Sequence, residues 1–161
     1  MDFYCFDTPL GTMALAGEEN AVTGLYLPGR PMPRMASRAT DLLAQGRAEL
    51  LEYLEGKRKE FDLPLKPNGT EFQCKVWAAL QQIPYGQTCS YREIAVQVGC
   101  PQGFRAVGMA NHRNPIPIFI PCHRVVGANG TLVGYAGGLD LKQKLLSLEQ
   151  GMTFPEPFEG I

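Results

Sequence analysis

Pro121-Cys-His-Arg-Val-Val126 places a thiol beside an imidazole, directly after the apolar run Ile116-Pro-Ile-Phe-Ile120. The prolines in this region argue against a central β-strand and predict a rigid, irregular, buried segment. A free cysteine is often simply buried in a core. A reactive cysteine needs a base that removes its proton, because the thiolate is the nucleophile. Cys122 and His123 are therefore the first candidate catalytic pair.

The residues after this pair offer a loop and a carboxylate. Gly134-Tyr-Ala-Gly-Gly138 is a glycine-rich loop that could bring backbone N–H groups and Tyr135 close to a flat ligand, or could be a plain connector. A last helix is predicted from an Asp140 cap to Glu149. Glu149 is the candidate acid that would orient His123, as in a catalytic triad. The alternative is a solvated helix end.

Two capping boxes upstream predict helix starts, Thr70-Glu-Phe-Gln73 and Ser90-Tyr-Arg-Glu93. A short turn after the second helix leads into a third, Phe104 to Arg113, which must end before Asn114-Pro115. The second and third helices form a helix-turn-helix candidate, although such pairs are also common as packing units. Trp77, in the first of these helices, is expected in the core.

Charge gives a local signal only. The formal net charge is −1, which indicates no global attraction to nucleic acid. From residue 84 to residue 139, however, Glu93 is the sole carboxylate, against Arg92, Arg105, Arg113 and Arg124. Arginine suits planar contacts with phosphates and bases. The alternative is a solvated basic face.

The N-terminal half predicts a small α/β unit. Residues 2–27 read as an antiparallel meander with strands of about five residues. Residues 36–43 and 47–54 have helical spacing, with Gly56 suited to end the second helix. Residues 57–69 have the composition of a linker, so the domain boundary is placed there. No catalytic constellation is found in residues 1–66.

The composition limits which cofactors the protein could bind and in which cellular compartment it is expected. Five cysteines without a CxxC pair or an export signal favour free thiols over a disulfide framework. His112 and His123 are the only histidines, so we predict no metal site, and we expect no cofactor. No run approaches the length of a membrane span, and the first residues lack a signal-peptide pattern, which predicts a cytoplasmic protein without membrane contact.

These motifs together resemble the O6-alkylguanine-DNA alkyltransferase (methylated-DNA–protein-cysteine methyltransferase) family. The resemblance runs from about residue 70 to residue 151 and is looser over residues 1 to 66. The segments that carry it are Arg105-Ala-Val-Gly108, Asn114-Pro-Ile-Pro117, Pro121-Cys-His-Arg-Val-Val126, Gly134-Tyr-Ala-Gly-Gly138 and Leu145-Leu-Ser-Leu-Glu149. It implies an α/β (α+β) fold: a ribonuclease-H-like α/β domain over residues 1–66 and a helical domain with a helix-turn-helix over residues 70–153.

The family's activity would be direct reversal of DNA damage. The resemblance implies that Cys122 takes an alkyl group from O6 of guanine, or less readily from O4 of thymine, and keeps it. His123 and Glu149 then match the base and its orienting acid, and Asn114 matches a residue that braces the site. Tyr135, Gly137 and Val125 would line the substrate pocket. One molecule would repair one lesion without a cofactor.

The implied partner is double-stranded DNA with an O6-alkylguanine, bound by a monomer through the minor groove. Tyr91 would crowd the phosphate and Arg105 would fill the stack after the base leaves. Gly108 and Ala110 would let the helix come close to DNA. The full set of expected DNA-binding residues is Tyr91, Arg105, Ala106, Gly108, Ala110 and Arg113.

Two other readings compete with alkyl transfer. A lesion-binding or DNA-binding helix-turn-helix protein without turnover explains residues 90–113 but leaves Cys122 and His123 idle. A thiol hydrolase would require repeated turnover of an acyl group. Relatives that bind lesions without repairing them have tryptophan at the cysteine position, so Cys122 favours the transferase.

Overall fold

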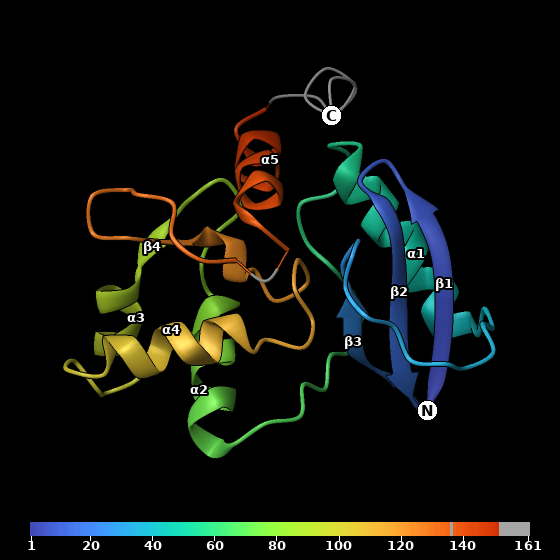
Figure 1. Cartoon of the computed structure of the whole chain (residues 1–161), viewed down its shortest axis with the longest axis horizontal. Coiled ribbons are helices and arrows are strands. Elements are labelled where there is room, and N and C mark those ends of the chain that lie inside the picture. Colours follow the sequence, from blue (N-terminus) through green and yellow to red (C-terminus); the bar gives the residue numbers. More distant parts are fainter. Residues whose placement is uncertain (136, 152–161) are drawn as a thin grey trace.

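The N-terminal half is a sheet covered by one helix. The computed structural model describes residues 1–135 and 137–151. Strands β1 (Asp2–Thr8), β2 (Gly11–Glu18) and β3 (Ala21–Tyr26) form an antiparallel sheet in the order β1-β2-β3. Helix α1 (Asp41–Leu54) lies across one face of this sheet (Figure 1). The expected meander is confirmed, with strands of six to eight residues instead of about five.

The prediction of a helix over residues 36–43 was wrong for residues 36–40. These residues follow the outer edge of β1, where the Arg38 N–H donates to Phe3 O at 2.7 Å and the Cys5 N–H donates to Ser37 Oγ at 2.9 Å. The exposed backbone groups of the edge strand are satisfied in this way. Thr40 then caps α1 through its side chain, which accepts from the Leu43 N–H.

One continuous helix also replaces the two that were expected in this region, because α1 runs through Gly46. A Cβ atom at Gly46 would lie 2.7 Å from Leu15 Cδ1. The glycine therefore lets the helix approach the sheet closely, and this contact outweighs its poor helix propensity. The chain leaves α1 at Gly56, which has the positive φ expected after a helix end.

The C-terminal half is helical. It contains α2 (Glu71–Leu80), α3 (Tyr91–Gln97), α4 (Phe104–His112) and α5 (Leu139–Glu149). Two short strands, β4 (Cys89–Ser90) and β5 (Val125–Val126), pair in parallel, and Cys122–Arg124 form a 3₁₀ turn, η1. Both predicted capping boxes form, and residues 116–120 are mostly buried without joining a strand.

The start of α5 differs from the prediction. Gly138, with φ 94°, precedes the helix, and no side chain caps it. Asp140 lies inside the first turn. The reversal of chain direction at Gly138 needs a backbone conformation that aspartate rarely adopts, so the glycine sets the helix start.

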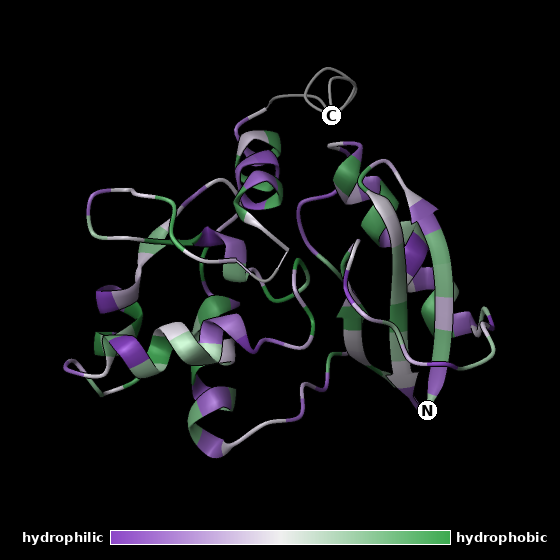
Figure 2. Ribbon diagram, viewed as in Figure 1, coloured by the Kyte–Doolittle hydropathy of each residue, from purple (hydrophilic) through white to green (hydrophobic). Residues whose placement is uncertain are grey.

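A single hydrophobic core joins the two halves. The linker pairs with β3, where the Val22 N–H donates to Pro64 O at 2.9 Å, and the Leu25 N–H donates to Pro115 O of the C-terminal half. The buried residues of this core come from both halves, and Figure 2 shows hydrophobic residues on the strands and helices of each half. Trp77 is buried in it, as predicted. We still propose domain limits of 1–66 and 70–153, although residues 152 and 153 lie outside the described residues.

The architecture is thus a mixed α/β fold with an N-terminal sheet domain and a helical C-terminal domain that contains the helix-turn-helix α3–α4, as expected. Within the described ranges, no helix has the length and apolar character that a membrane crossing needs.

Candidate active site

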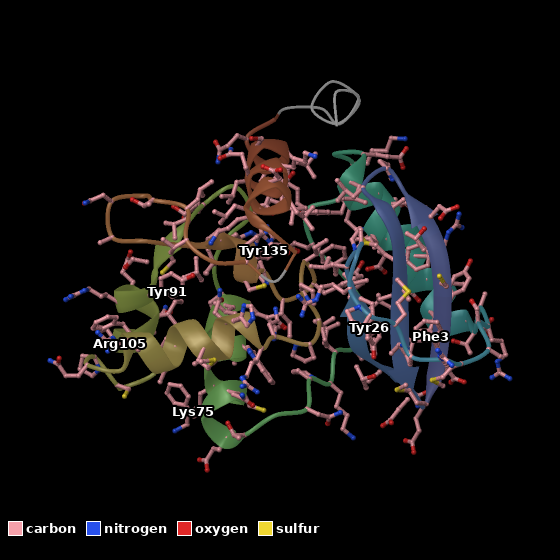
Figure 3. The ribbon with its side chains drawn as sticks, viewed as in Figure 1. Phe3, Tyr26, Lys75, Tyr91, Arg105 and Tyr135 are labelled. Carbon is pink, nitrogen blue, oxygen red and sulfur yellow. The ribbon has the colours of Figure 1, made fainter. Side chains whose placement is uncertain are left out.

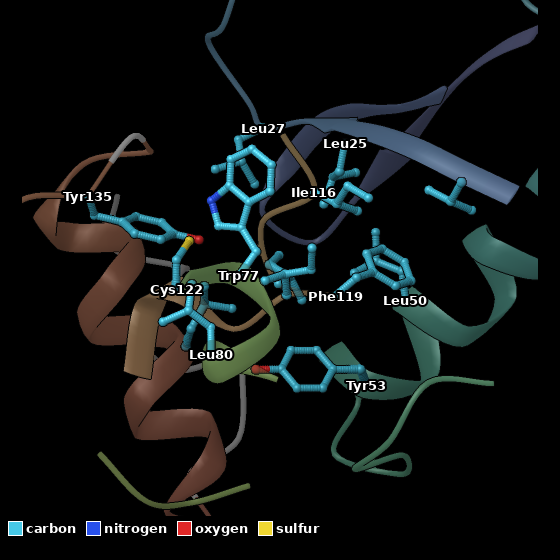
Figure 4. Close-up of a cluster of buried hydrophobic side chains, with 14 of the residues drawn as sticks. Leu25, Leu27, Leu50, Tyr53, Trp77, Leu80, Ile116, Phe119, Cys122 and Tyr135 are labelled. Atoms are coloured by element: carbon cyan, nitrogen blue, oxygen red, sulfur yellow. The ribbon is translucent and has the colours of Figure 1, made fainter. Parts of the chain in front are cut away.

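Cys122, His123 and Arg124 form the 3₁₀ turn η1, and all three are buried. A 3₁₀ turn has about three residues per turn, so consecutive side chains point in different directions. Three neighbouring residues can therefore serve three separate contacts. Cys122 faces Tyr135, as Figure 4 shows, while His123 and Arg124 reach the end of α5.

His123 is held by Glu149. Its Nε2 lies 2.7 Å from Glu149 Oε2, and both side chains are almost fully buried. An ionised carboxylate only accepts hydrogen bonds, so Nε2 carries the proton and Nδ1 presents its lone pair. Nδ1 is buried and has no hydrogen-bond partner among residues 1–135 and 137–151. This nitrogen is therefore available as a base on the side of the ring away from Glu149.

Arg124 neutralises Glu149. Its Nε donates to Oε1 at 2.8 Å and its Nη2 to Oε2 at 3.0 Å, a bidentate arrangement, while Nη1 donates to Ile83 O. The expectation that Arg124 belongs to a basic surface was wrong, because the side chain is buried and paired inside the protein. A buried carboxylate needs such a partner.

The N-terminal half contributes to this network. The Tyr53 hydroxyl, from α1, donates to Glu149 Oε2 at 2.6 Å, and the Gly86 N–H donates to Oε1 at 3.1 Å. Figure 4 shows Tyr53 reaching from α1 toward the core of the C-terminal half. The sequence had shown no catalytic constellation in residues 1–66. The sequence gives no indication of this role for Tyr53, because the residue continues an apolar helical stripe and is therefore expected in the core.

The protonation states follow from these contacts. Burial raises the pKa of Glu149, but the hydrogen bonds from His123 and Arg124 outweigh it and bring the pKa to about 2. Burial lowers the pKa of His123, and Glu149 offsets this only in part. At neutral pH the pair is therefore an anionic carboxylate beside a neutral imidazole, which can accept a proton.

Cys122 rests as a thiol. Burial raises its pKa to about 11, and a hydrogen bond with Asn114 and the charge of Lys142 offset this only in part. Asn114 is itself fixed, because its Nδ2 donates to Ile120 O at 2.8 Å and its Oδ1 accepts from the Ile116 N–H. A reaction at this sulfur needs a base, since the thiolate is scarce at neutral pH.

Lys142 is a residue that the sequence reading missed. It is fully buried on α5, and its Nζ donates to the carbonyls of Val125, Val133 and Gly134. The ammonium thereby ties the loop that carries Tyr135 to β5. One of these carbonyls belongs to Val125, a residue that was expected to line the substrate pocket.

Tyr135 lies beside Cys122, and a Cβ atom added at Gly137 would lie 3.2 Å from the Tyr135 ring. Burial raises the pKa of Tyr135 well above its usual value, so its hydroxyl stays protonated. A Cβ atom at Gly137 would lie 2.6 Å from Leu141 and 2.9 Å from Leu27. The glycine therefore serves packing between the halves. A cavity of about 40 Å³ near Tyr135 is lined by Tyr91, Gly108, Asn111, His112, Gly134 and Tyr135.

The helix-turn-helix exposes part of the expected DNA surface. Arg105 and Ala106 are exposed on α4, and Figure 3 shows Arg105 and Tyr91 near each other on one side of the molecule. Gly108 faces Tyr91, whose ring would lie 3.8 Å from an added Cβ. Arg113 is exposed at the end of α4.

Ala110 was also expected on this surface, but the structure places it elsewhere. It is 2% exposed, and its carbonyl accepts from Trp77 Nε1 at 2.8 Å. The small side chain therefore serves the packing of α4 on α2. Within the described residues, no cluster of three or more His, Cys, Asp or Glu side chains could hold a metal ion.

Comparison with known proteins gives a consistent picture. The family model described as "6-O-methylguanine DNA methyltransferase, DNA binding domain" matches residues 71–151, and the one described as the "ribonuclease-like domain" of the same family matches residues 3–67. The methylated-DNA–protein-cysteine methyltransferase of Methanosarcina barkeri is 46% identical over 93% of this chain and 98% of its own. The constitutive enzyme of that name from Bacillus subtilis is 45% identical, over 93% and 96%.

Solved structures agree with this. Mycobacterium tuberculosis OGT in complex with DNA superposes with a TM-score of 0.91 at 40% identity, over 98% of this chain and 99% of that one. The O6-methylguanine methyltransferase of the same organism gives a TM-score of 0.85 at 42% identity, over 93% of both chains. This chain therefore belongs to the 6-O-methylguanine DNA methyltransferase family.

Proposed function

We propose that this protein repairs DNA by moving an alkyl group from O6 of a modified guanine, or less readily from O4 of a modified thymine, to Sγ of Cys122. The observation that carries the proposal is the buried Cys122 beside His123, whose Nε2 is held by the Glu149 carboxylate and whose Nδ1 has no partner among the described residues. A thiol with a raised pKa gains its nucleophilic form only through such a base.

In the proposed step, His123 Nδ1 accepts the Cys122 proton, directly or through a water molecule. The thiolate attacks the alkyl carbon, so the S–C bond forms and the C–O6 bond breaks. The guanine leaves with the bonding electron pair and takes up a proton. The imidazolium formed on the way is stabilised by the anionic Glu149. The product is a thioether, which water does not cleave readily, so each molecule acts once.

For DNA, we propose that a monomer docks α4 into the minor groove and that the target base leaves the stack. An alkyl group inside a duplex lies out of reach of a buried sulfur, so the base must move. The exposed Arg105 and Ala106, and Tyr91 packed beside Gly108, support this assignment. Ala110 is left out of the DNA surface because it is buried.

The proposed function is tested by measuring how many methyl groups each protein molecule accepts and which cysteine accepts them. A duplex with a single O6-methylguanine, labelled in the methyl group, should transfer label to the protein up to an equimolar amount. Cys122→Ala should abolish the transfer, because the nucleophile is gone, whereas Cys100→Ala, which removes an exposed thiol, should leave it intact. Peptide mass spectrometry would locate the methyl group. Release of more than one equivalent of methyl would contradict single turnover and favour a hydrolase.

A second prediction concerns Arg105. If its side chain fills the space left by the flipped base, Arg105→Ala should slow transfer from duplex DNA by roughly 10- to 100-fold, since unstacking a base costs a few kcal/mol. Reaction with free O6-benzylguanine, which needs no flipping, should change little. Arg47→Ala, on the exposed face of α1, serves as the control. An equal loss on both substrates would argue against the flipping role.

The rival of a helix-turn-helix protein that only binds DNA makes a different forecast for the same samples. It requires DNA binding without any change in the mass of the protein. The network of Tyr53, His123, Arg124 and Glu149 would then have no purpose beside the thiol.

A further inference from the structure

Tyr53 shares one carboxylate oxygen with the imidazole of His123. In the part of the chain that the structure describes, three donors reach Oε2 of Glu149: the Tyr53 hydroxyl at 2.6 Å, His123 Nε2 at 2.7 Å and Arg124 Nη2 at 3.0 Å. The shortest of these contacts comes from α1, in the N-terminal half. The oxygen that holds His123 is therefore not reserved for the imidazole.

Packing fixes the position of the Tyr53 hydroxyl. The side chain is 0% exposed, and Figure 4 shows it reaching from α1 toward the C-terminal half. The centre of its ring lies 5.5 Å from that of Phe61 and 6.2 Å from that of Tyr85. Phe61 follows α1 and Tyr85 follows α2, so both halves hold the ring. Its hydroxyl lies 3.5 Å from His123 Nε2, as expected for two donors that meet at one acceptor.

Tyr53 can only donate to this carboxylate. Burial and the charge of Glu149 raise the pKa of Tyr53 well above its usual value, so the hydroxyl keeps its proton at neutral pH. A hydrogen bond to an ionised carboxylate stabilises the negative charge and makes the oxygen a weaker base. The Tyr53 hydroxyl therefore reduces the attraction of Oε2 for the proton on His123 Nε2.

The protonation of His123 depends on several opposing charges. Burial and the cations Arg124 and Lys142 favour the neutral imidazole, whereas Glu149 favours the imidazolium. An imidazolium has no lone pair and cannot accept the Cys122 proton. The titratable and charged groups around the His123–Glu149 pair are Tyr53 on α1, Tyr85 after α2, Cys122 and Arg124 on η1, Tyr135 before α5, and Lys142 on α5.

We propose that Tyr53 is a positioning residue that keeps His123 neutral, and so able to accept the Cys122 proton, by donating to the carboxylate oxygen that also holds the imidazole. This inference rests on the proposed function, in which His123 is the base. Tyr53 acts through Glu149. The N-terminal half thereby takes part in setting the protonation equilibrium of a base that belongs to the C-terminal half.

Tyr53→Phe tests the inference, because it removes the hydroxyl and keeps the packed ring. Without this donor, Oε2 should attract the His123 proton more strongly, and the imidazolium should persist to higher pH. Single-turnover rates with free O6-benzylguanine are measured as the pH is lowered. Where the unaltered protein reacts at half of its plateau rate, the variant should be roughly fivefold slower, because one hydrogen bond changes a protonation equilibrium by about tenfold. At higher pH, where both imidazoles are neutral, the two rates should agree.

An NMR titration of the imidazole gives a readout that does not depend on alkyl transfer. The chain has two histidines, so a His112→Gln background leaves the His123 ring as the single signal. The midpoint of its titration should lie at higher pH in the Tyr53→Phe variant. Tyr4→Phe makes the same chemical change on β1 and serves as the matched control, with no expected change in the titration or the rates.

Two outcomes would overturn the inference. One is a Tyr53→Phe variant in which His123 stays neutral down to the same pH as in the unaltered protein. The other is a loss of rate by the same factor at every pH together with a lower melting temperature, which would mean that Tyr53 only supports the fold. Absence of alkyl transfer by the unaltered protein would instead refute the proposed function, and the NMR titration would still decide whether Tyr53 controls the protonation of His123.

Discussion

Replacing Glu149 with glutamine is expected to lower the free energy of unfolding by about 3–5 kcal/mol, the usual loss when one member of a buried ion pair is removed. The carboxylate accepts hydrogen bonds from His123, Arg124 and Tyr53, and Arg124 is buried. Without the negative charge, that guanidinium stays in the interior uncompensated. For a chain of this size the melting temperature should fall by roughly 10 °C.

The same substitution should change how the free energy of unfolding depends on pH under acidic conditions. The pKa of Glu149 is about 2 in the folded state, below its ordinary value of 4.5. A depressed carboxyl pKa stabilises the fold at pH values above the unfolded pKa, and the stabilisation is lost as pH falls from about 4.5 toward 2. In the Glu149→Gln variant, this fall in stability between about pH 4.5 and pH 2 should be absent.

Urea unfolding at several pH values measures both effects. Glu52→Gln is the control, because this half-exposed carboxylate pairs with Arg58 at the surface and should contribute at most about 1 kcal/mol. A Glu149→Gln variant as stable as the Glu52→Gln variant would contradict the role of Glu149 as the charge that holds the two halves and the active site together.

Replacing His123 with asparagine is expected to slow alkyl transfer about 10²- to 10⁴-fold at pH 7, the usual contribution of a general base. The direction of the pH dependence follows from the pKa of the Cys122 thiol. Its pKa is about 11, so without a base the thiolate fraction rises about tenfold for each pH unit below that value. The defect of the variant should therefore shrink steadily as the pH rises toward 10.

Free O6-benzylguanine is the suitable substrate for this profile, because it removes the pH dependence of DNA binding. The unaltered protein should show a flatter profile over the same range, since the neutral His123 supplies the base throughout. A variant whose defect is the same at every pH would show that His123 supports the fold instead of accepting the proton.

Local sequence signals predicted much of the C-terminal half. The capping boxes at Thr70 and Ser90 place helix starts correctly, because the contacts that define them lie within four residues. The prolines around residues 116–120 exclude a strand for an equally local reason. The helix start at Asp140 and the helix over residues 36–40 were predicted wrongly, because Gly138 and the edge of β1 decide them through backbone geometry and distant pairing.

The sequence by itself determined the family, the fold class and the candidate nucleophile, since the motif around Cys122 and the order of the other motifs are written in the chain. The environment of that thiol was decided only in three dimensions. Arg124 reads as a surface cation and Tyr53 as core, yet both meet Glu149 at 3.0 Å or less. Burial and charge pairing set the pKa of each group, and both depend on which side chains the fold brings together.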